Sequence, residues 1–343
     1  MGQRFSYGGQ AVLEGVMIRG EHFVSLAVRR RSGQIHTDCE ALGSLYTGRL
    51  RRLPLVRGII VLVETLVLGF KALDRSARIA LEDVAEEEGQ EAPGWFLVLA
   101  MGFAFVLALG LFVVVPLFLT RATDPYITSD VLSNLVEGVI RLLVLIAYLW
   151  AIAFIPDVKR VFAYHGAEHK AVHAYEEGVP LEVEEVRRFS TAHARCGTAF
   201  LLVVVVVAIL AFAFLGRPPL VWRLLSRIAL IPVIAAISYE VIRFSGAHSD
   251  NRLVRATLYP SLWLQSLSTR QPDDGQIEVA IQAVKAAIAA DGGEPIPAVV
   301  SEDAGKALPT GAATSAPATP PPDSPPTPQA GPGCGTGGQP PPA

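Results

Sequence analysis

The sequence is poor in charge and in cysteine. Only 18% of its 343 residues are charged, whereas roughly a quarter are charged in an ordinary soluble domain, and 51% are hydrophobic. The net charge of −3 provides no basic surface for nucleic acid, so no nucleic-acid partner is expected. Three widely separated cysteines exclude a disulfide scaffold. No apolar segment follows the first residues, so no signal peptide is expected. A membrane protein is the class that remains.

Uncharged runs predict membrane-spanning helices. Residues 95–119 carry no charge over 25 residues, which as a helix measures about 37 Å against a hydrocarbon core of about 30 Å. Together with three further apolar runs, this run predicts four membrane spans. Spans 1 and 2 are expected within residues 95–155, and spans 3 and 4 within residues 196–242. For the last run, a helix packed at the membrane interface is the alternative. Long side chains can snorkel to the headgroups, so the weaker runs tolerate their arginines, Arg141, Arg223 and Arg227.

The positions of lysine and arginine predict how the spans are oriented. Arginine is frequent before residue 95, arginine and lysine occur together in the connection 157–195 and after Ile242, and both are scarce in the other two connections. Because positive residues favour the cytoplasmic side, both termini and the 157–195 connection are predicted to be cytoplasmic. The expected location is therefore the cytoplasmic (inner) membrane, crossed several times, with the lipid bilayer as the main partner.

The segment 53–80 is apolar but carries three charges seven residues apart. Arg57, Glu64 and Lys71 fall on one face of a helix. A fifth span would place the arginine-rich N-terminus outside, so the segment is predicted to be an amphipathic or membrane-dipping helix. Its charged face is interpreted as the side facing water, with a functional face within the membrane, including Glu64, as the alternative.

The remaining segments predict small cytoplasmic parts. Residues 1–50 form a glycine-rich β unit, in which 8–20 is either a bulged strand or a loop that presents Glu14 and Arg19 to a site. A cytoplasmic helical segment follows at 243–290, and the proline-rich residues 291–343 form a disordered tail. The expected fold class is mainly α, a polytopic membrane helix bundle of about four spans with that β unit and tail.

Three histidines in the 157–195 connection carry the strongest chemical signal. His165, His169 and His173 are four residues apart, so they lie along one face of a helix, next to Glu168. Two neutral imidazoles at i and i+4 can bind one divalent metal, most often zinc. The order His-x-x-Glu-His also occurs in zinc hydrolases, in which the glutamate takes a proton from water rather than binding the metal.

A zinc hydrolase of this kind needs a third metal ligand, and the sequence offers several candidates for it. His193 or Cys196 would lie at the membrane surface before span 3, while His248 and Asp250 follow span 4. These groups lie near cytoplasmic ends of spans, where a bundle would bring them together. The alternative is an ordinary solvated helix with unrelated histidines, and Cys196 as a small buried apolar residue.

Several motifs in order resemble one bacterial family. GGQAVLEGVMIRG, PLVRG, YHGAEHKAVHAYE, HARCGT and TRQPDDGQIEVAI are similar to the YqhQ-like family over about residues 5–290. Ser261 departs from the glycine usual in the family. The resemblance implies an uncharacterised membrane protein, predicted to be a metal-dependent enzyme, whose metal residues would fall on the following positions: His165, Glu168, His169, His173, His193 and Cys196.

Two functions follow as expectations. The first is a metal-dependent, zinc-type hydrolase with Glu168 as general base, acting on an unidentified membrane-proximal substrate or membrane-protein partner. The second is a non-catalytic membrane factor in which the histidine or metal cluster only holds the cytoplasmic part on the bundle. Transport is less favoured, because the two strongest runs contain no charge.

Overall fold

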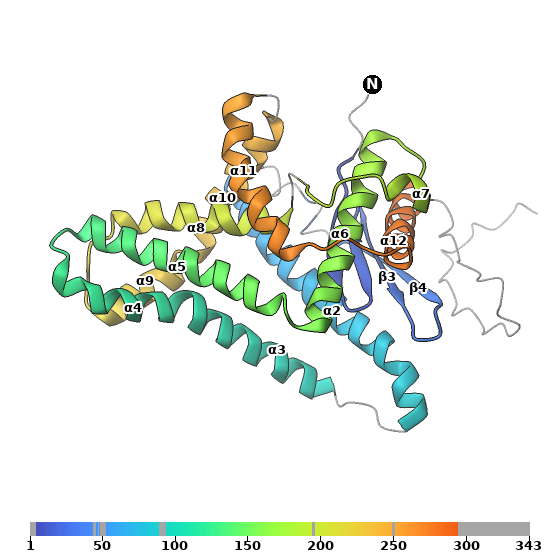
Figure 1. Cartoon of the computed structure of the whole chain (residues 1–343), viewed down its shortest axis with the longest axis horizontal. Coiled ribbons are helices and arrows are strands. Elements are labelled where there is room, and N and C mark those ends of the chain that lie inside the picture. The colour runs from blue at the N-terminus through green and yellow to red at the C-terminus, as the bar shows by residue number, and fades with distance from the viewer. Residues whose placement is uncertain are drawn as a thin grey trace, which may run out of the picture. The chain divides into compact units, whose positions relative to one another are not determined.

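A computed structural model describes residues 5–43, 46, 48, 53–88, 94–193, 196–248 and 251–293 (Figure 1). The predicted N-terminal β unit is an antiparallel sheet with the order β1-β2-β3-β4. Its strands are Gly8–Val12, Gly15–Arg19, Phe23–Arg29 and Ile35–Ala41. Most of the predicted tail lies outside the described residues, and Asp291, where the tail was predicted to begin, lies in the last turn of a helix that ends at Gly292.

Helices cover both faces of the sheet because its strands are apolar on both sides. Val16 and Ile18 of β2 pack with α6 (Pro156–Glu177) and α12 (Asp274–Gly292). Met17 between them points to the opposite face, where the sheet packs on α2 (Val56–Glu88). Side chains alternate between the faces of a strand, so the run of apolar residues in β2 supplies two cores. Figure 1 shows α6 and α12 beside the strands.

Asp291 fastens the turn between β2 and β3 to α12. Its carboxylate accepts hydrogen bonds from the backbone N–H groups of Glu21, His22 and Phe23, at 2.6, 2.8 and 3.2 Å. The hydroxyl of Tyr7 donates a fourth at 3.1 Å. Both burial and this nearby carboxylate raise the pKa of Tyr7.

We expect Asp291→Ala to lower the free energy of unfolding by about 2–4 kcal/mol, because it leaves several donors without their charged acceptor. Thermal unfolding of the detergent-purified protein measures this effect. Asp74→Ala is the matched control, since Asp74 pairs with the exposed Arg78 one turn further along the same helix. Equal melting temperatures for the two variants would contradict the role of Asp291.

The charged face of α2 is turned inward at Arg57 and Glu64, which corrects its interpretation as the side facing water at these two residues, whereas Lys71 is exposed. Glu64 is 3% exposed and accepts a hydrogen bond from Arg19 at 3.0 Å. Arg57 pairs with Glu240 of α10 (Ile231–Ala247), and Lys71 pairs with Glu40 of β4. Many exposed residues of α2 are instead apolar: Val56, Ile59, Val63, Leu66, Val67, Phe70 and Leu73. Such an outward apolar stripe suits a helix that contacts lipid.

The predicted apolar runs form helices that indicate a membrane protein. The first run contains α3 (Gly94–Leu109), a π-helical turn (Gly110–Val114) and α4 (Val115–Thr123). The other runs form α5 (Asp130–Ile152), α8 (Gly197–Ala213), and α9 (Leu220–Ala229) followed by α10. Within the described chain, two stretches are long and apolar enough to span, Gly102–Tyr126 and Asp130–Ile152. The bent pair α9–α10 would make a third, and α8 is a shorter apolar helix.

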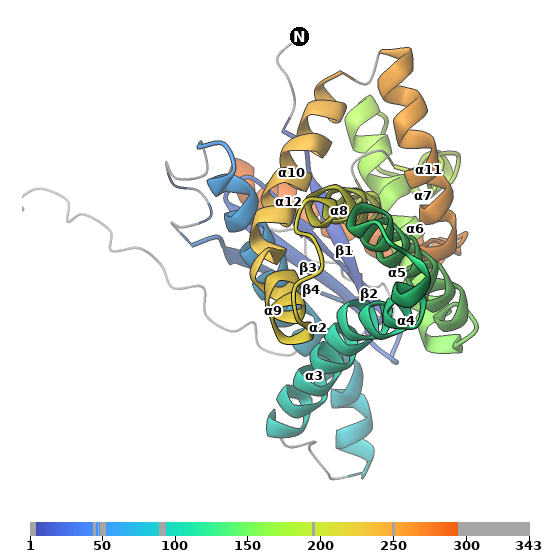
Figure 2. The ribbon, with the colours of Figure 1, turned by 90° about the vertical axis from the view of Figure 1, so that its left-hand side faces the viewer.

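These helices pack around α8. Figure 2, in which α8 is seen nearly end-on, shows α5 and α10 beside it, and both contact it. The last helix before α12 is α11 (Arg252–Ser268), which also packs on α8. Small residues allow close approach, since a side chain at Gly138 of α5 would overlap Ile209 of α8.

The arginines of the weaker runs point inward, not to the headgroups as predicted. Glu137 of α5 is 1% exposed and accepts hydrogen bonds from Arg141 at 2.8 Å, Arg223 at 2.9 Å and Arg227 at 3.1 Å. Arg141 also donates to the carbonyl of Phe112, within the π-helical turn. This network, named here the Glu137 network, ties α9 to α5 through buried charges.

Candidate metal centre

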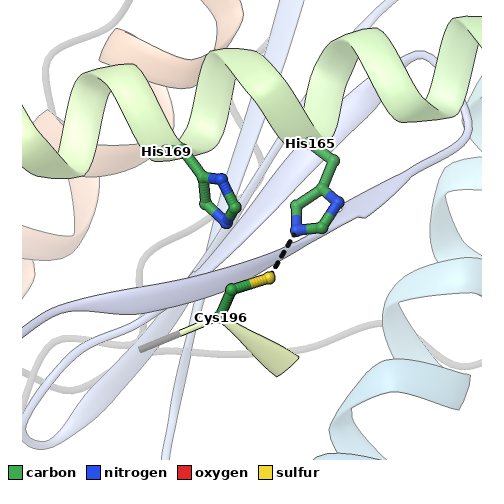
Figure 3. Close-up of side chains that lie close together, drawn as sticks. All are labelled: His165, His169 and Cys196. Atoms are coloured by element: carbon green, nitrogen blue, oxygen red, sulfur yellow. Dashed lines mark hydrogen bonds between the residues drawn. The ribbon is translucent and has the colours of Figure 1, made fainter. Parts of the chain in front are cut away.

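Helix α6 presents two of the predicted histidines to one point. Pro156 occupies its first turn and Gly178 ends it in a left-handed conformation. His165 and His169 are one turn apart, so their rings share a face, at a centroid distance of 4.4 Å. Figure 3 shows both rings pointing towards Cys196, the residue that precedes α8.

The three side chains have the spacing of a metal site. Nε2 of His165 lies 3.2 Å from Sγ of Cys196, and one ligand atom from each of His165, His169 and Cys196 lies within 4.8 Å of the others. Nitrogen and sulfur ligands of one tetrahedral zinc ion would be about 3.5 Å apart. The cluster, named here the His–His–Cys cluster, therefore needs little movement to bind an ion.

Backbone carbonyls fix the tautomers of both histidines. Nδ1 of His165 lies 2.9 Å from the carbonyl oxygen of Ser268, and Nδ1 of His169 lies 2.6 Å from that of Thr191. A carbonyl only accepts hydrogen bonds, so each Nδ1 carries a hydrogen. In the neutral rings this leaves both Nε2 lone pairs free to bind a cation, the arrangement typical of histidine ligands.

The cluster also stabilises a thiolate. Burial acts to raise the pKa of Cys196, but hydrogen bonds from His165 and His169 outweigh it and lower the pKa to about 4. Burial acts to lower the pKa of His165, and the bond to Cys196 overrides it and raises the pKa to about 9. The thiolate is the form of cysteine that binds metals.

Four hydrogen bonds hold the loop before α8, two to Lys170 of α6 and two to Gln265 of α11. Lys170 donates to the carbonyls of Arg187 and Phe189 at 2.8 and 2.6 Å, which positions the loop that carries Thr191. Burial lowers the pKa of Lys170. The side chain of Gln265 bonds the backbone N–H and carbonyl of His193, at 2.8 and 3.1 Å.

Gly166 allows the chain after α11 to approach α6. An alanine Cβ there would lie 2.1 Å from the carbonyl oxygen of Arg270, next to the segment that bonds His165. We expect Gly166→Ala to destabilise the protein by about 1–3 kcal/mol through overpacking. Gly102→Ala in α3 is the control, since its Cβ would meet nothing within 4 Å and alanine favours a helix. Thermal unfolding of both variants tests this, and a melting temperature that rises in both would contradict it.

Glu168 lines a cavity beside the cluster. The cavity, named here the metal cavity, has a volume of about 200 Å³ and is bordered by Glu168, the cluster, His193 and the backbone of β1. Glu168 is 4% exposed, and its carboxylate lies 3.5 Å from Nε2 of His169. The absence of a side chain at Gly9 of β1 keeps space for the side chain of Glu168, because a Cβ at this position would lie 3.1 Å from Cγ of Glu168. A water molecule in the metal cavity would be near both a bound ion and a carboxylate.

Other predicted residues lie around the cluster or away from it. His193 borders the metal cavity, with its ring 4.5 Å from that of His173 and its Nε2 3.4 Å from Glu176. Cys196 is thus at ligand spacing from His165 and His169, while the ring of His193 lies further out, 5.6 Å from that of His169. His248 is exposed at the end of α10, where its Nδ1 contacts the carbonyl of Phe244. Asp250 lies outside the described residues.

The glycine-rich segment covers the site with backbone rather than with its charges. Residues 8–20 form the β1–β2 hairpin, whose turn contains Glu14 at a φ of 52°. Glu14 accepts from Arg160 at 2.6 Å and from Tyr164 at 3.2 Å, on α6 but away from the metal cavity. Arg19 pairs with Glu64, and only the glycines of β1 border the metal cavity.

The fold and the cluster define a helical membrane protein with a buried His–His–Cys cluster. Residues 53–290 match a family described as protein of unknown function, DUF1385. The uncharacterized protein YqhQ of Bacillus subtilis (strain 168) is 35% identical over 290 residues, covering 81% of this chain and 91% of that protein. No solved structure matches. The chain belongs to this YqhQ-like family, which confirms the resemblance of its motifs.

Proposed function

We propose that the protein is a metal-dependent hydrolase of the cytoplasmic membrane, with zinc bound by His165, His169 and Cys196. The observation that carries this proposal is the pair of carbonyl bonds to Nδ1 of His165 and His169, which leaves Nε2 of each ring to face the sulfur of Cys196 at the spacing of metal ligands. Imidazole and thiolate suit zinc, whereas magnesium and calcium prefer oxygen ligands. Three protein ligands with an adjoining cavity correspond to a catalytic rather than a structural zinc site.

The side chains around the cavity would then share the chemistry. A zinc ion at the cluster would lower the pKa of bound water to near 7. Glu168 would accept a proton from the attacking water and deliver it to the leaving group. The carbonyls of Ser268 and Thr191 would keep the two imidazoles in the binding tautomer. The basic cytoplasmic segments support a multi-pass topology with both termini and the metal cavity on the cytoplasmic side.

Glu168→Gln separates chemistry from metal binding. The zinc-loaded protein is incubated with a total membrane extract in ¹⁸O-labelled water, and mass spectrometry searches the lipid and peptide fractions for products that have gained the label. Wild type should yield a labelled product. Glu168→Gln should yield none and keep its zinc, because Glu168 is not a ligand. Glu177→Gln, an exposed glutamate at the end of the same helix, is the matched control and should behave as wild type.

Two results would overturn this assignment. A Glu168→Gln protein that loses its zinc, or forms as much product as wild type, would show that Glu168 is not the base. Full zinc content in wild type, with no labelled product from either fraction, would favour the non-catalytic membrane factor. In that case zinc would serve to join α6 to the start of α8, since its ligands come from both.

A further inference from the structure

Three cavities follow one another from the His–His–Cys cluster into the apolar helices. The metal cavity shares Ser6, Gly8, Gly9, Cys196 and Gly197 with a second cavity of about 500 Å³, named here the middle cavity. The middle cavity shares Leu62 and Phe200 with a third of about 440 Å³, named here the apolar cavity. The cluster therefore lies at one end of a series of neighbouring cavities that reaches the space between the apolar helices.

The apolar cavity has the lining and length for a hydrocarbon chain. It lies among α2, α3, α5, α8 and α10, and its only charged lining residues are Arg141 and Arg227. Both guanidinium groups are bound to Glu137, and both lie over the ring of Phe212, at 5.2 and 4.3 Å. Along α8 the lining runs from Phe200 to Phe212, about 18 Å at the rise of a helix.

The apolar cavity opens towards lipid rather than water. Phe105 and Leu201 line it and are 53% and 42% exposed, on helices whose other exposed residues are also apolar. Water gains no hydrogen bonds in such a space, so an apolar cavity of this kind takes up an apolar ligand instead. In a membrane, the available apolar ligand is the acyl chain of a lipid.

The middle cavity is more polar than the apolar cavity, and Cys196 is one of its lining residues. Gln10, Thr65 and Tyr239 line it, together with the ion pair of Arg19 and Glu64. These groups offer both donors and acceptors to a polar head, next to a thiolate in the metal cavity. An amphiphile would thus have its chain in the apolar cavity and its head beside the cluster.

We propose that the protein binds a bilayer lipid, with one acyl chain in the apolar cavity and the polar head in the middle cavity next to the His–His–Cys cluster. Binding is inferred from the three neighbouring cavities, whereas the identity of this lipid as the substrate rests on the proposed hydrolase function. The lipid enters sideways from the bilayer between α3 and α8. Its head then reaches the metal cavity without leaving the membrane surface.

A photoreactive lipid tests the binding. The full-length protein is placed in phosphatidylglycerol–phosphatidylethanolamine vesicles that contain a phospholipid with a diazirine in its acyl chain, and cross-linked peptides are mapped by mass spectrometry. Cross-links are expected on the cavity face of α8, at Val204, Val205 and Ala208. Val204→Phe should lower their yield by about tenfold, because the larger side chain overfills the space.

Val206→Phe is the matched control, because Val206 is on the same helix, is 46% exposed and does not line the cavity. Its cross-links should equal those of wild type. Zinc content and gel filtration check that both variants are folded. Cross-links confined to outward residues such as Phe103 and Val106, with equal yield in both variants, would overturn the proposal.

A His165→Ala/His169→Ala protein separates this proposal from the proposed hydrolase. Lipid binding does not require the metal, so that variant should give the same α8 cross-links as wild type while forming no labelled product. Cross-links in wild type without any hydrolysis would retain the lipid site and reject the enzyme. Hydrolysis in wild type without α8 cross-links would retain the enzyme and reject the lipid site.

Discussion

Glu137→Ala is expected to destabilise the protein by about 3–5 kcal/mol, the usual cost of removing one partner from a buried ion pair. Glu137 accepts hydrogen bonds from Arg141, Arg223 and Arg227, and Arg227 is itself only 1% exposed. Without the carboxylate, positive charges would remain among apolar helices. Thermal unfolding of the detergent-purified protein should show a large fall in melting temperature.

A second substitution tests whether uncompensated charge causes that loss. Combining Glu137→Ala with Arg227→Met removes one cation, so the double variant should lose less than the sum of the single losses. The control is Glu185→Ala, which removes an exposed ion pair with Arg188 and should change the melting temperature little. If the stability loss of the double variant equals the sum of the two single losses, Glu137 and Arg227 are not coupled, and the Glu137 network as a coupled unit is contradicted.

His165→Ala/His169→Ala is expected to abolish metal binding. Only Cys196 of the three ligands would remain, so the metal content should fall from about one ion per chain to background. Inductively coupled plasma mass spectrometry of the purified protein measures this. His248→Ala is the matched control, because His248 is exposed at the end of α10 and should leave the metal content unchanged.

Removal of the metal by a chelator should lower the thermal stability of the protein, which tests the same site in a second way. A ligand that binds only the folded protein stabilises it, so removal of the metal should lower the melting temperature of wild type. The double histidine variant should show no such response to chelator. A chelator effect of equal size in both proteins would place the metal elsewhere.

The apolar helices were predictable from the sequence, but whether the charged side chains within them point to the protein interior or to the surface was not. Uncharged runs mark helices because a span must be apolar over its length. The sequence assigns Arg227 to a lipid headgroup, since nothing in it places Glu137, on another helix, at the right depth. For α2, spacing placed Arg57, Glu64 and Lys71 on one face, yet only the partners Glu240 and Arg19 show that this face is internal at Arg57 and Glu64.

The two α6 histidines were predictable because the i, i+4 spacing alone puts both rings on one face. The choice of Cys196 over His193 was not, since it depends on how the loop after α6 meets the start of α8. The carbonyls of Ser268 and Thr191 carry no signal in the sequence, because every residue has one. Lys170 carries no separate signal, because Glu168 and His169 beside it are polar too and the sequence does not show that it is buried against the carbonyls of Arg187 and Phe189.

X-ray absorption spectroscopy at the zinc edge tests the central claim most directly. The zinc-loaded protein should show two nitrogen ligands at about 2.0–2.1 Å and one sulfur at about 2.3 Å, with a light atom completing four-coordination. Cys196→Ser should remove the sulfur. A first shell of nitrogen and oxygen alone in wild type, or sulfur that persists in Cys196→Ser, would contradict a metal centre formed by His165, His169 and Cys196.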